Sequence, residues 1–545
     1  MMNPLLAASR SADAKAQPAE TTRAERFERL VSEVAARDAL PEDRYAVAAL
    51  LESMGWNDAR AAEAFGTSDI FELAVEVWEA VRRKVVTSTF AVNEERGVLR
   101  TGLALLKSFL RGVIFALPMA ISVISMLTLK FSLWSYEHLS VEIATCIAIG
   151  TIASFVVVGG FTQAIARRGF FYISQGYYTM AHKVTFLFIR LGYAAALVAC
   201  VLLLVFNLVF NVFPPEMFLY IVLYFFFLVS IWLSVTVMYI LRRELAFTGL
   251  ILAGIGLVYV LFRVLAWDVI FAQLLSILVV SAAGMALVVY FFRQAAKREE
   301  KGIAPNMPRM AVTVYAVAPY FAYGLLYFAF LFVDRIMAWS SNAGYMPYFI
   351  WFRGEYELGL DFALLSLMIP LGVCEVMVNK MMLDVEASYK RYWGFESELM
   401  NARFRRIYNR MMAVIAASSA LSALLVYGLV EMFDGLYYAR EGEHLIASAT
   451  TRFVFIVALL AYVILATGLM NAVTLFALSQ PSLVNRAIVP ALAVNVALGF
   501  ALSRWIDYSL AVFGVLAGAI VFSALSFRSM RQVIGKLDYY LYAIA

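Results

Sequence analysis

The sequence predicts an all-α polytopic membrane protein with about 12 transmembrane helices in two six-helix halves, preceded by a small N-terminal cytoplasmic helical domain. Hydrophobic residues make up 63% of the 545 residues and charged residues only 15%, and the mean hydropathy is +0.80. Average soluble proteins are roughly 45–50% apolar and about 25% charged, which excludes a soluble globule. Three cysteines and a net charge of +5 also exclude a disulfide scaffold, a disordered chain and a nucleic-acid-coating protein.

The first 100 residues are the water-compatible part of the chain, because they carry 30 of its 83 charges. Residues 1–21 are small and polar, which predicts a disordered tail. Apolar residues recur at helical spacing over 22–85, where Asn57 or Asp58 is an expected helix cap. We expect a cytoplasmic helical domain there, either a docking module for a partner or a solvated extension, and a linker or interfacial segment over 86–108.

Twelve apolar segments follow, each near the roughly 20 residues that a bilayer requires. They are 109–129, 142–165, 190–212, 217–241, 246–265, 269–292, 313–333, 358–380, 411–431, 453–478, 485–503 and 508–527. With the N-terminus inside, the body places 24 Lys and Arg residues on the cytoplasmic side and 7 outside. This agrees with the positive-inside rule, so both termini are expected to be cytoplasmic.

The spans repeat as two halves, 109–300 and 301–545. An amphipathic, aromatic stretch follows both the second and the eighth span, and Pro118 and Pro319 lie near the middle of the first and seventh. Pro370 is a further expected kink, in the eighth span. Proline inside a span frees backbone groups that neighbours or a cavity must satisfy, and interruptions at corresponding places point to a transport site. Two unrelated kinks are the alternative.

Charged residues in or beside the spans are the candidate substrate-pathway residues, because a charge in lipid is costly. Glu375 lies inside the eighth span and is the first candidate for a substrate-facing or proton-carrying group. Lys380 follows it near the inner interface and could reach the headgroups. Asp334 and Arg335 end the seventh span, where an ordinary interfacial ion pair is the alternative.

Further candidates lie around these residues. The outer loop before the eighth span is polar and mostly acidic, either a vestibule or a solvated loop, with Arg353, Glu355, Glu357 and Asp361. Arg111 near the start of the first span is expected at a cavity or at headgroups. Aromatic rings can stack on sugars, although packing alone also explains a stripe of them in the seventh span, which contains Tyr320, Tyr323 and Tyr327.

No enzyme motif is present, whether a nucleotide-binding glycine loop, a zinc-protease helix or a soluble acidic metal cluster. The three histidines lie in three separate loops, and the three cysteines have apolar settings. We therefore expect no enzyme activity, no catalytic residue, no metal, no cofactor and no nucleic-acid partner.

The layout of twelve spans, kinked first spans and amphipathic segments resembles the multidrug/oligosaccharidyl-lipid/polysaccharide (MOP) flippase superfamily. Within it, one region resembles the PelG family of exopolysaccharide transporters. It contains Asp334-Arg335-Ile336-Met337-Ala338-Trp339, Tyr356-Glu357-Leu358-Gly359-Leu360-Asp361-Phe362-Ala363, Ile369-Pro370 and Glu386-Ala387-Ser388-Tyr389-Lys390-Arg391-Tyr392. The likeness covers about 315–410 in residues and 100–540 in topology. The N-terminal domain departs from the family pattern, and the first half matches only in layout.

This resemblance implies a flippase in the bacterial inner membrane that exports a polysaccharide or lipid-linked saccharide for a biofilm. Its implied partners are membrane lipid, a cytoplasmic glycosyltransferase and other membrane subunits of a synthase complex. Two alternatives remain: an ion-coupled exporter of small amphipathic molecules on the same fold, which a buried acid in the first six spans would favour, and a membrane scaffold of a synthase complex that transports nothing.

Overall fold

The computed structural model describes residues 23–37, 43–87, 98–136, 138–297, 299, 309–341, 346–389 and 397–542. It divides into two compact units, Met1–Thr101 with Leu383–Glu398, and Gly102–Met382 with Leu399–Ala545. The predicted tail over 1–21 lies outside the described residues, as does the part of the predicted linker over 88–97. We call the second unit the body.

Four helices form the N-terminal domain, with the bounds Arg23–Arg37 (α1), Arg44–Ser53 (α2), Asp58–Phe65 (α3) and Ile70–Thr87 (α4). Their apolar faces share one core that includes Val34, Leu51, Leu73 and Val77. The Asn57 side chain accepts a hydrogen bond from the Arg60 amide at the start of α3, as an N-cap does. Of the two expected caps of this helix, Asn57 therefore takes the role.

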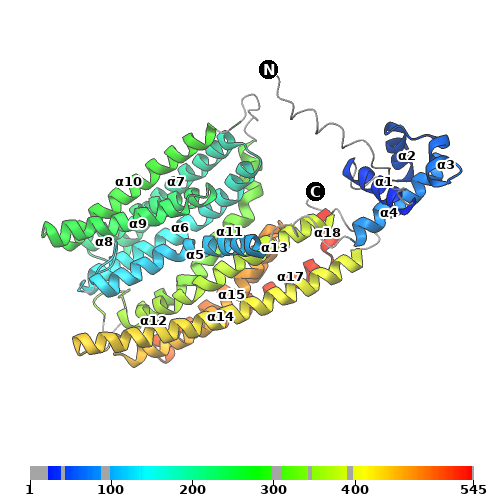
Figure 1. Ribbon diagram of the computed structural model, residues 1–545. Coiled ribbons are helices and arrows are strands. Elements are labelled where there is room, and N and C mark those ends of the chain that lie inside the picture. The colour runs from blue at the N-terminus through cyan, green and yellow to red at the C-terminus, as the bar shows by residue number, and fades with distance from the viewer. Residues whose placement is uncertain are drawn as a thin grey trace, which may run out of the picture. The chain divides into compact units, whose positions relative to one another are not determined.

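The body is all-helical in its described residues and confirms the predicted fold class. The first half contains Val98–Leu129 (α5), Val141–Ser174 (α6), Tyr178–Phe210 (α7), Pro215–Ile240 (α8), Glu244–Tyr259 (α9) with a π-helical turn over Val260–Val264, and Val269–Ala296 (α10). The second contains Met310–Trp339 (α11), Gly354–Leu364 (α12), Met368–Tyr389 (α13), Ser397–Glu441 (α14), Ala449–Ala477 (α15), Pro481–Trp505 (α16), Val512–Gly535 (α17) and Leu537–Tyr542 (α18). These helices run side by side in Figure 1.

Eleven helices among the described residues are long and apolar enough to cross a membrane, against the twelve expected. The remaining expected span, 109–129, lies in α5, a 32-residue helix of which several side chains are outside the described residues. The chain is a multi-pass membrane protein by this count. α5 and α11 are helical throughout, so Pro118 and Pro319 lie inside continuous helices.

The eighth span is interrupted, at the place where Pro370 was expected to kink it. A 3-10 turn over Leu365–Leu367 separates α12 from α13. Because Pro370 has no N–H, the carbonyl group of Ser366 four residues earlier has no helical donor. The Ser422 hydroxyl of α14 donates to that carbonyl oxygen at 2.7 Å instead.

Each half contains a close helix crossing at a glycine. A Cβ on Gly150 of α6 would lie 2.9 Å from the Ile221 carbonyl oxygen of α8. In the second half, a Cβ on Gly359 of α12 would lie 2.8 Å from the Thr451 carbonyl oxygen of α15. The second and fourth spans of each half thus cross closely at one glycine.

Two further glycine crossings join the halves along a surface that we call the seam. α6 packs against α11, and a Cβ on Gly324 would lie 2.1 Å from the Gly159 carbonyl oxygen. α5 meets α13 where a Cβ on Gly112 would lie 2.7 Å from the Cα of Gly372. Two backbones can approach this closely only where neither residue has a side chain.

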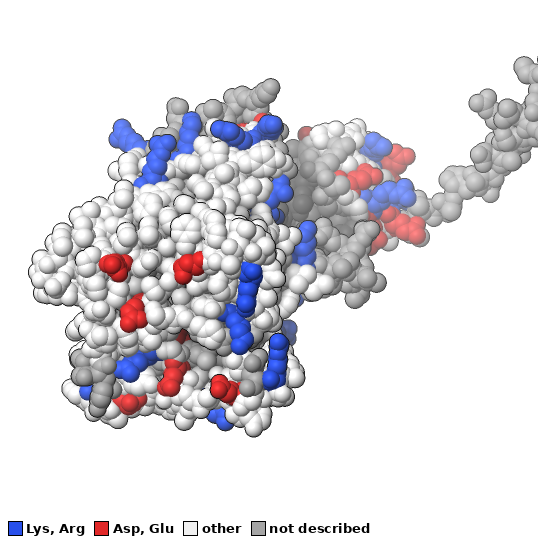
Figure 2. All heavy atoms as spheres, turned by 90° about the vertical axis from the view of Figure 1, so that its left-hand side faces the viewer, with Lys and Arg blue, Asp and Glu red and all other residues white. Residues whose placement is uncertain are grey.

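We name the ends of the body by their exposed charges. The acidic end, where α11 ends and α12 begins, exposes Glu216, Asp268 and Glu355, and the basic end, where α6 ends and α11 begins, exposes Arg242 and Arg528. Figure 2 faces the acidic end and shows a few acidic and basic groups on a mostly uncharged surface.

Candidate functional site

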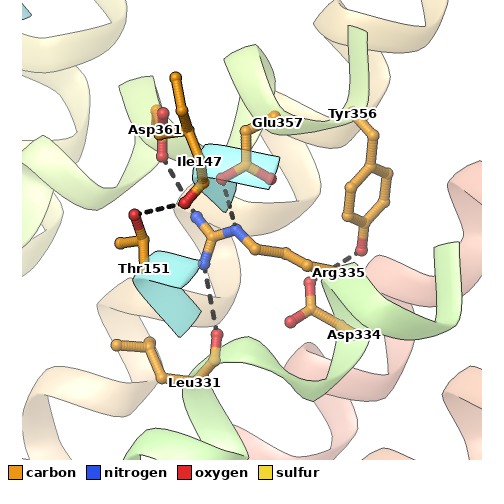
Figure 3. A network of polar contacts seen from close by, with 8 residues as sticks. All are labelled: Ile147, Thr151, Leu331, Asp334, Arg335, Tyr356, Glu357 and Asp361. Atoms are coloured by element: carbon orange, nitrogen blue, oxygen red, sulfur yellow. Dashed lines mark hydrogen bonds and ion pairs between the residues drawn. The ribbon is translucent and has the colours of Figure 1, made fainter. Parts of the chain in front are cut away.

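Arg335 is the centre of a buried charged network near the acidic end of α11. Its side chain is only 2% exposed, and its Nε lies 2.7 Å from Glu357 Oε1. Its Nη2 lies 3.2 Å from Asp361 Oδ1, and its Nη1 donates to the Leu331 carbonyl at 3.5 Å. Glu357 and Asp361 are four residues apart on α12, so they lie on the same face of that helix. Figure 3 shows both carboxylates pointing at the guanidinium group.

Asp334 is the second fully buried charge, and it is held from α12 as well. The Tyr356 hydroxyl donates to Asp334 Oδ2 at 2.8 Å, while Oδ1 has no hydrogen-bond partner. The network therefore brings three carboxylates together with one guanidinium. Asp334 and Arg335 are buried, whereas the side chains of Glu357 and Asp361 are 18% and 46% exposed. Because buried Asp334 lacks a cation of its own among the described residues and a buried charge must be paired or neutralised, the network is a candidate for binding a proton or a cationic group. No three metal-ligating side chains converge among the described residues, so the carboxylates do not form one ion cage.

The network borders the seam. Figure 3 places Ile147 and Thr151 of α6 beside the Arg335 guanidinium and Asp361. The same guanidinium lies 4.9 Å from the ring centroid of Phe332. Through that ring the network reaches the first half, because Phe332 stacks on Phe155 of α6 at 5.3 Å.

Aromatic stacking continues from there into the first half. Phe155 also stacks on Phe328 of α11 at 5.0 Å and on Trp232 of α8 at 4.2 Å. The Trp232 indole N–H donates to Ser154 at 2.9 Å. Charged groups of the second half and aromatic groups of both halves thus form one continuous contact along the seam.

Glu375, the first candidate from the sequence, lies at the other glycine crossing of the seam. A Cβ on Gly112 of α5 would lie 3.2 Å from its Cβ, so the side chain borders the first half. The Asn379 amide donates to Glu375 Oε1 at 3.1 Å. Lys380 is exposed, and the Arg111 side chain lies outside the described residues.

The expected acidic vestibule divides into two groups. Glu357 and Asp361 belong to the Arg335 network, whereas Arg353 and Glu355 face Tyr508. The Arg353 guanidinium lies 4.5 Å from the Tyr508 ring centroid, and the Tyr508 hydroxyl donates to Glu355 at 3.3 Å. These four residues therefore contact two different sets of partners.

The tyrosines of α11 lie mostly inside the second half. Tyr320 and Tyr323 are 5% exposed, and their ring centroids lie 5.4 Å and 4.8 Å from that of Phe476 on α15. Tyr327 stacks on Tyr323 at 5.7 Å. In this conformation the stripe packs between helices, and Tyr320 also contacts Arg167 of the first half.

Several residues of the site had no separate signal in the sequence. Tyr356 adjoins Glu357 in the motif, but its bond to Asp334 depends on how α12 packs on α11. Phe155 is one of 42 phenylalanines, and nothing local marks it. Among the described residues of the first half, Glu244 at the start of α9 has one buried carboxylate oxygen, which has no hydrogen-bond partner.

The body thus consists of two six-helix halves that meet along a charged and aromatic seam. The chain has the fold of MATE transporters of the MOP superfamily. It resembles the Vibrio cholerae MATE transporter VcmN with a TM-score of 0.55 and 12% identity, over 80% of this chain and 97% of that one. The corresponding values are 0.54, 12%, 81% and 99% for a eukaryotic MATE transporter, and 0.54, 14%, 80% and 96% for a MOP superfamily transporter from Pyrococcus furiosus.

These similar structures are transporters and not enzymes. No protein-family model matches the sequence, and no curated protein does.

Proposed function

We propose that this chain exports a polysaccharide or lipid-linked saccharide across the bacterial inner membrane, along the seam between its halves, together with a cytoplasmic glycosyltransferase. One observation carries the proposal. Two of the four segments on which the PelG resemblance rests, Asp334-Arg335 and Tyr356 to Asp361, meet in one network around the buried Arg335, beside the seam of a transporter fold. A buried ion pair contributes little net stability compared with well-packed apolar residues, so the stability of the fold alone does not require this network.

Partner binding is assigned in this proposal to the N-terminal domain. Tyr45 and Phe71 are 57% and 51% exposed, and their rings lie 6.3 Å apart. An exposed aromatic pair suits docking to a protein partner. The distribution of basic residues supports cytoplasmic termini, with the basic end inside.

The experiment starts with deletion of the gene in its host and an assay of surface polysaccharide. The deletion strain is complemented with the full chain, with Glu357→Gln, with Glu375→Gln and with a chain that lacks residues 1–85. Glu431→Gln is the matched control, because Glu431 forms its ion pair with Arg452 of the same half, on the surface of the body. We expect loss of polysaccharide on deletion, and restoration by the control but not by Glu357→Gln or Glu375→Gln at equal protein level.

Two outcomes would redirect the proposal. Unchanged polysaccharide after deletion would reject saccharide export. Full restoration by both seam variants, with none by the truncated chain, would favour the scaffold alternative.

The carboxylate surplus around Arg335 favours a second candidate, an ion-coupled exporter of small amphipathic molecules. Three carboxylates and one guanidinium carry an excess of negative charge, which a proton or cation supplied by a gradient would neutralise. For this function we expect dye efflux from loaded vesicles to depend on an imposed proton or sodium gradient. Efflux that ignores both gradients would reject it.

A further inference from the structure

Arg167 of α6 reaches across the seam at the basic end of the body. Its Nη2 donates to the Ser479 hydroxyl at 2.7 Å, although the two residues are 312 positions apart. Ser479 belongs to the turn between α15 and α16, where its φ of 54° is in the left-handed region. A charge-assisted hydrogen bond is among the stronger polar contacts, so Arg167 ties the first half to this turn.

The same guanidinium also contacts a second element of the second half. It lies 5.0 Å from the ring centroid of Tyr320 on α11, a cation–π contact. Tyr320 in turn packs on Phe476, three residues before Ser479. One side chain of the first half is therefore held by both α11 and the end of α15.

The position of this contact along the seam defines its role. Arg167 is eight residues beyond Gly159, or about 12 Å along α6, and Tyr320 is one turn from Gly324. At the acidic end, the Phe352 amide donates to the Thr145 hydroxyl at 3.1 Å. Among the described residues, the seam thus has a close glycine crossing in its middle and a hydrogen bond between the halves toward each end.

We propose that Arg167 is the residue that closes the seam at the basic end, through Ser479 and Tyr320, and that this contact must break whenever substrate enters from that end. The inference rests on the proposed transport function. Neighbouring Arg168 provides the contrast, because its guanidinium lies 5.7 Å from the ring of Phe171 on its own helix. Among the described residues, no hydrogen bond or ion pair joins Arg168 to the second half, and it acts on Tyr320 only through its charge.

Thiol labelling of the full-length protein tests the closure directly. The reporter is Gln163→Cys, because Gln163 Cγ lies at the crossing, 2.8 Å from the position of a Cβ on Gly324. Cys146, Cys200 and Cys374 are replaced by alanine. A membrane-impermeant maleimide is added to inside-out and to right-side-out vesicles, and the rate of labelling is measured from each side.

We expect Arg167→Gln to raise the labelling rate from the basic side by about tenfold, the scale of a lost charge-assisted bond. Arg168→Gln should leave the rate unchanged. Arg167→Lys should restore part of the closure, because an ammonium group can still donate to Ser479 but lacks the planar fork. Ser479→Ala is a milder variant that keeps the charge, and it should raise the rate in the same direction.

An unchanged rate in both Arg167→Gln and Ser479→Ala, with each protein monodisperse and its thiol reactive after denaturation, would overturn the closure. A rise that Arg168→Gln produces equally would do the same. The proposed substrate is tested separately: a faster rate in Arg167→Gln, together with normal polysaccharide in the deletion strain, would keep the closure and reject saccharide export.

Discussion

Gly159 and Gly324 bring α6 and α11 so close that a Cβ on Gly324 would lie 2.1 Å from the Gly159 carbonyl oxygen. The obstacle is backbone, which cannot rotate away as a side chain does. This contact joins the two halves between the Arg335 network at one end and Arg167 at the other. Close packing of small residues is a general way in which membrane helices associate, and here it places the halves against each other at the middle of the seam.

Gly324→Ala is expected to destabilise the protein strongly, because α6 and α11 must move apart to admit a methyl group. Overpacking usually costs about 1–3 kcal/mol, and a backbone obstacle favours the upper part of that range. Thermal unfolding of the detergent-solubilised chain, followed by size exclusion, measures the effect. The matched control is Gly428→Ala in α14, where nothing lies within 4 Å of the added Cβ. If both variants unfold at the same temperature as the parent, the crossing is not tight.

Arg335→Met should destabilise the body and abolish export, because it leaves Glu357 and Asp361 facing each other without their cation. Removing one partner of a fully buried pair typically costs about 3–5 kcal/mol, and because the side chains of Glu357 and Asp361 are 18% and 46% exposed, we expect a loss near or below the lower end of that range. Replacing Glu357 by glutamine in the same chain should recover part of the stability, since one of the unpaired charges is then gone. The yield and unfolding temperature of the folded protein measure both effects.

The control for this prediction is Arg452→Met, which breaks a surface pair whose side chains are 51% and 35% exposed. Exposed pairs contribute only about 0–1 kcal/mol. An equal fall in unfolding temperature in Arg335→Met and Arg452→Met would show that the Arg335 network stabilises the protein no more than a surface ion pair does.

Ser422→Ala should destabilise the protein by about 1–3 kcal/mol, because it leaves the buried Ser366 carbonyl without a donor. Pro370→Ala supplies the missing N–H, so the double variant is expected to be more stable than the sum of the single effects predicts. A double-mutant cycle on unfolding temperature isolates this coupling. Ser418→Ala on the same helix is the control, since its hydroxyl bonds only within its own turn. Additive effects of Ser422→Ala and Pro370→Ala would contradict the inference that the Ser422 hydroxyl substitutes for the N–H that Pro370 lacks.

Acid should loosen the start of α4 in the N-terminal domain. The Glu72 carboxylate accepts hydrogen bonds from the Ser68 amide at 2.6 Å and the Ser68 hydroxyl at 2.8 Å. These bonds, the backbone one first, lower the pKa of Glu72 below its usual 4.5. A lowered folded-state pKa stabilises the fold above the unfolded value, and this contribution is lost as the pH falls through the folded value.

Hydrogen exchange of the full-length protein between pH 7 and pH 3 measures this loss at the α4 N-terminus. Glu72→Gln is expected to expose the Ser68 amide already at pH 7 and to remove most of the pH dependence of protection. Glu52→Gln, on the exposed surface of α2, should leave the pH dependence of protection unchanged. If protection falls with pH identically in both variants, the Glu72 carboxylate is not the group that makes the α4 N-terminus sensitive to acid.

The order and type of the helices followed from local composition. A span is an uninterrupted run of apolar residues, because the backbone in lipid must satisfy its own hydrogen bonds, and the alternation of Lys and Arg between loops separates each span from the next. The pair Asp334-Arg335 and the run from Tyr356 to Asp361 also stood out locally, because charge beside an apolar run is rare. Eleven of the predicted spans are found by length and composition among the described residues.

What the sequence determined by itself is therefore the membrane class, the two-part layout and the residues with unusual local chemistry. Only the tertiary structure decided which of them meet. Arg167 and Ser479 are 312 residues apart, and the Ser422 hydroxyl substitutes for an N–H that Pro370 lacks. Hydropathy is a property of single segments, whereas a hydrogen bond or a glycine crossing depends on the relative position of two helices, which no single segment encodes.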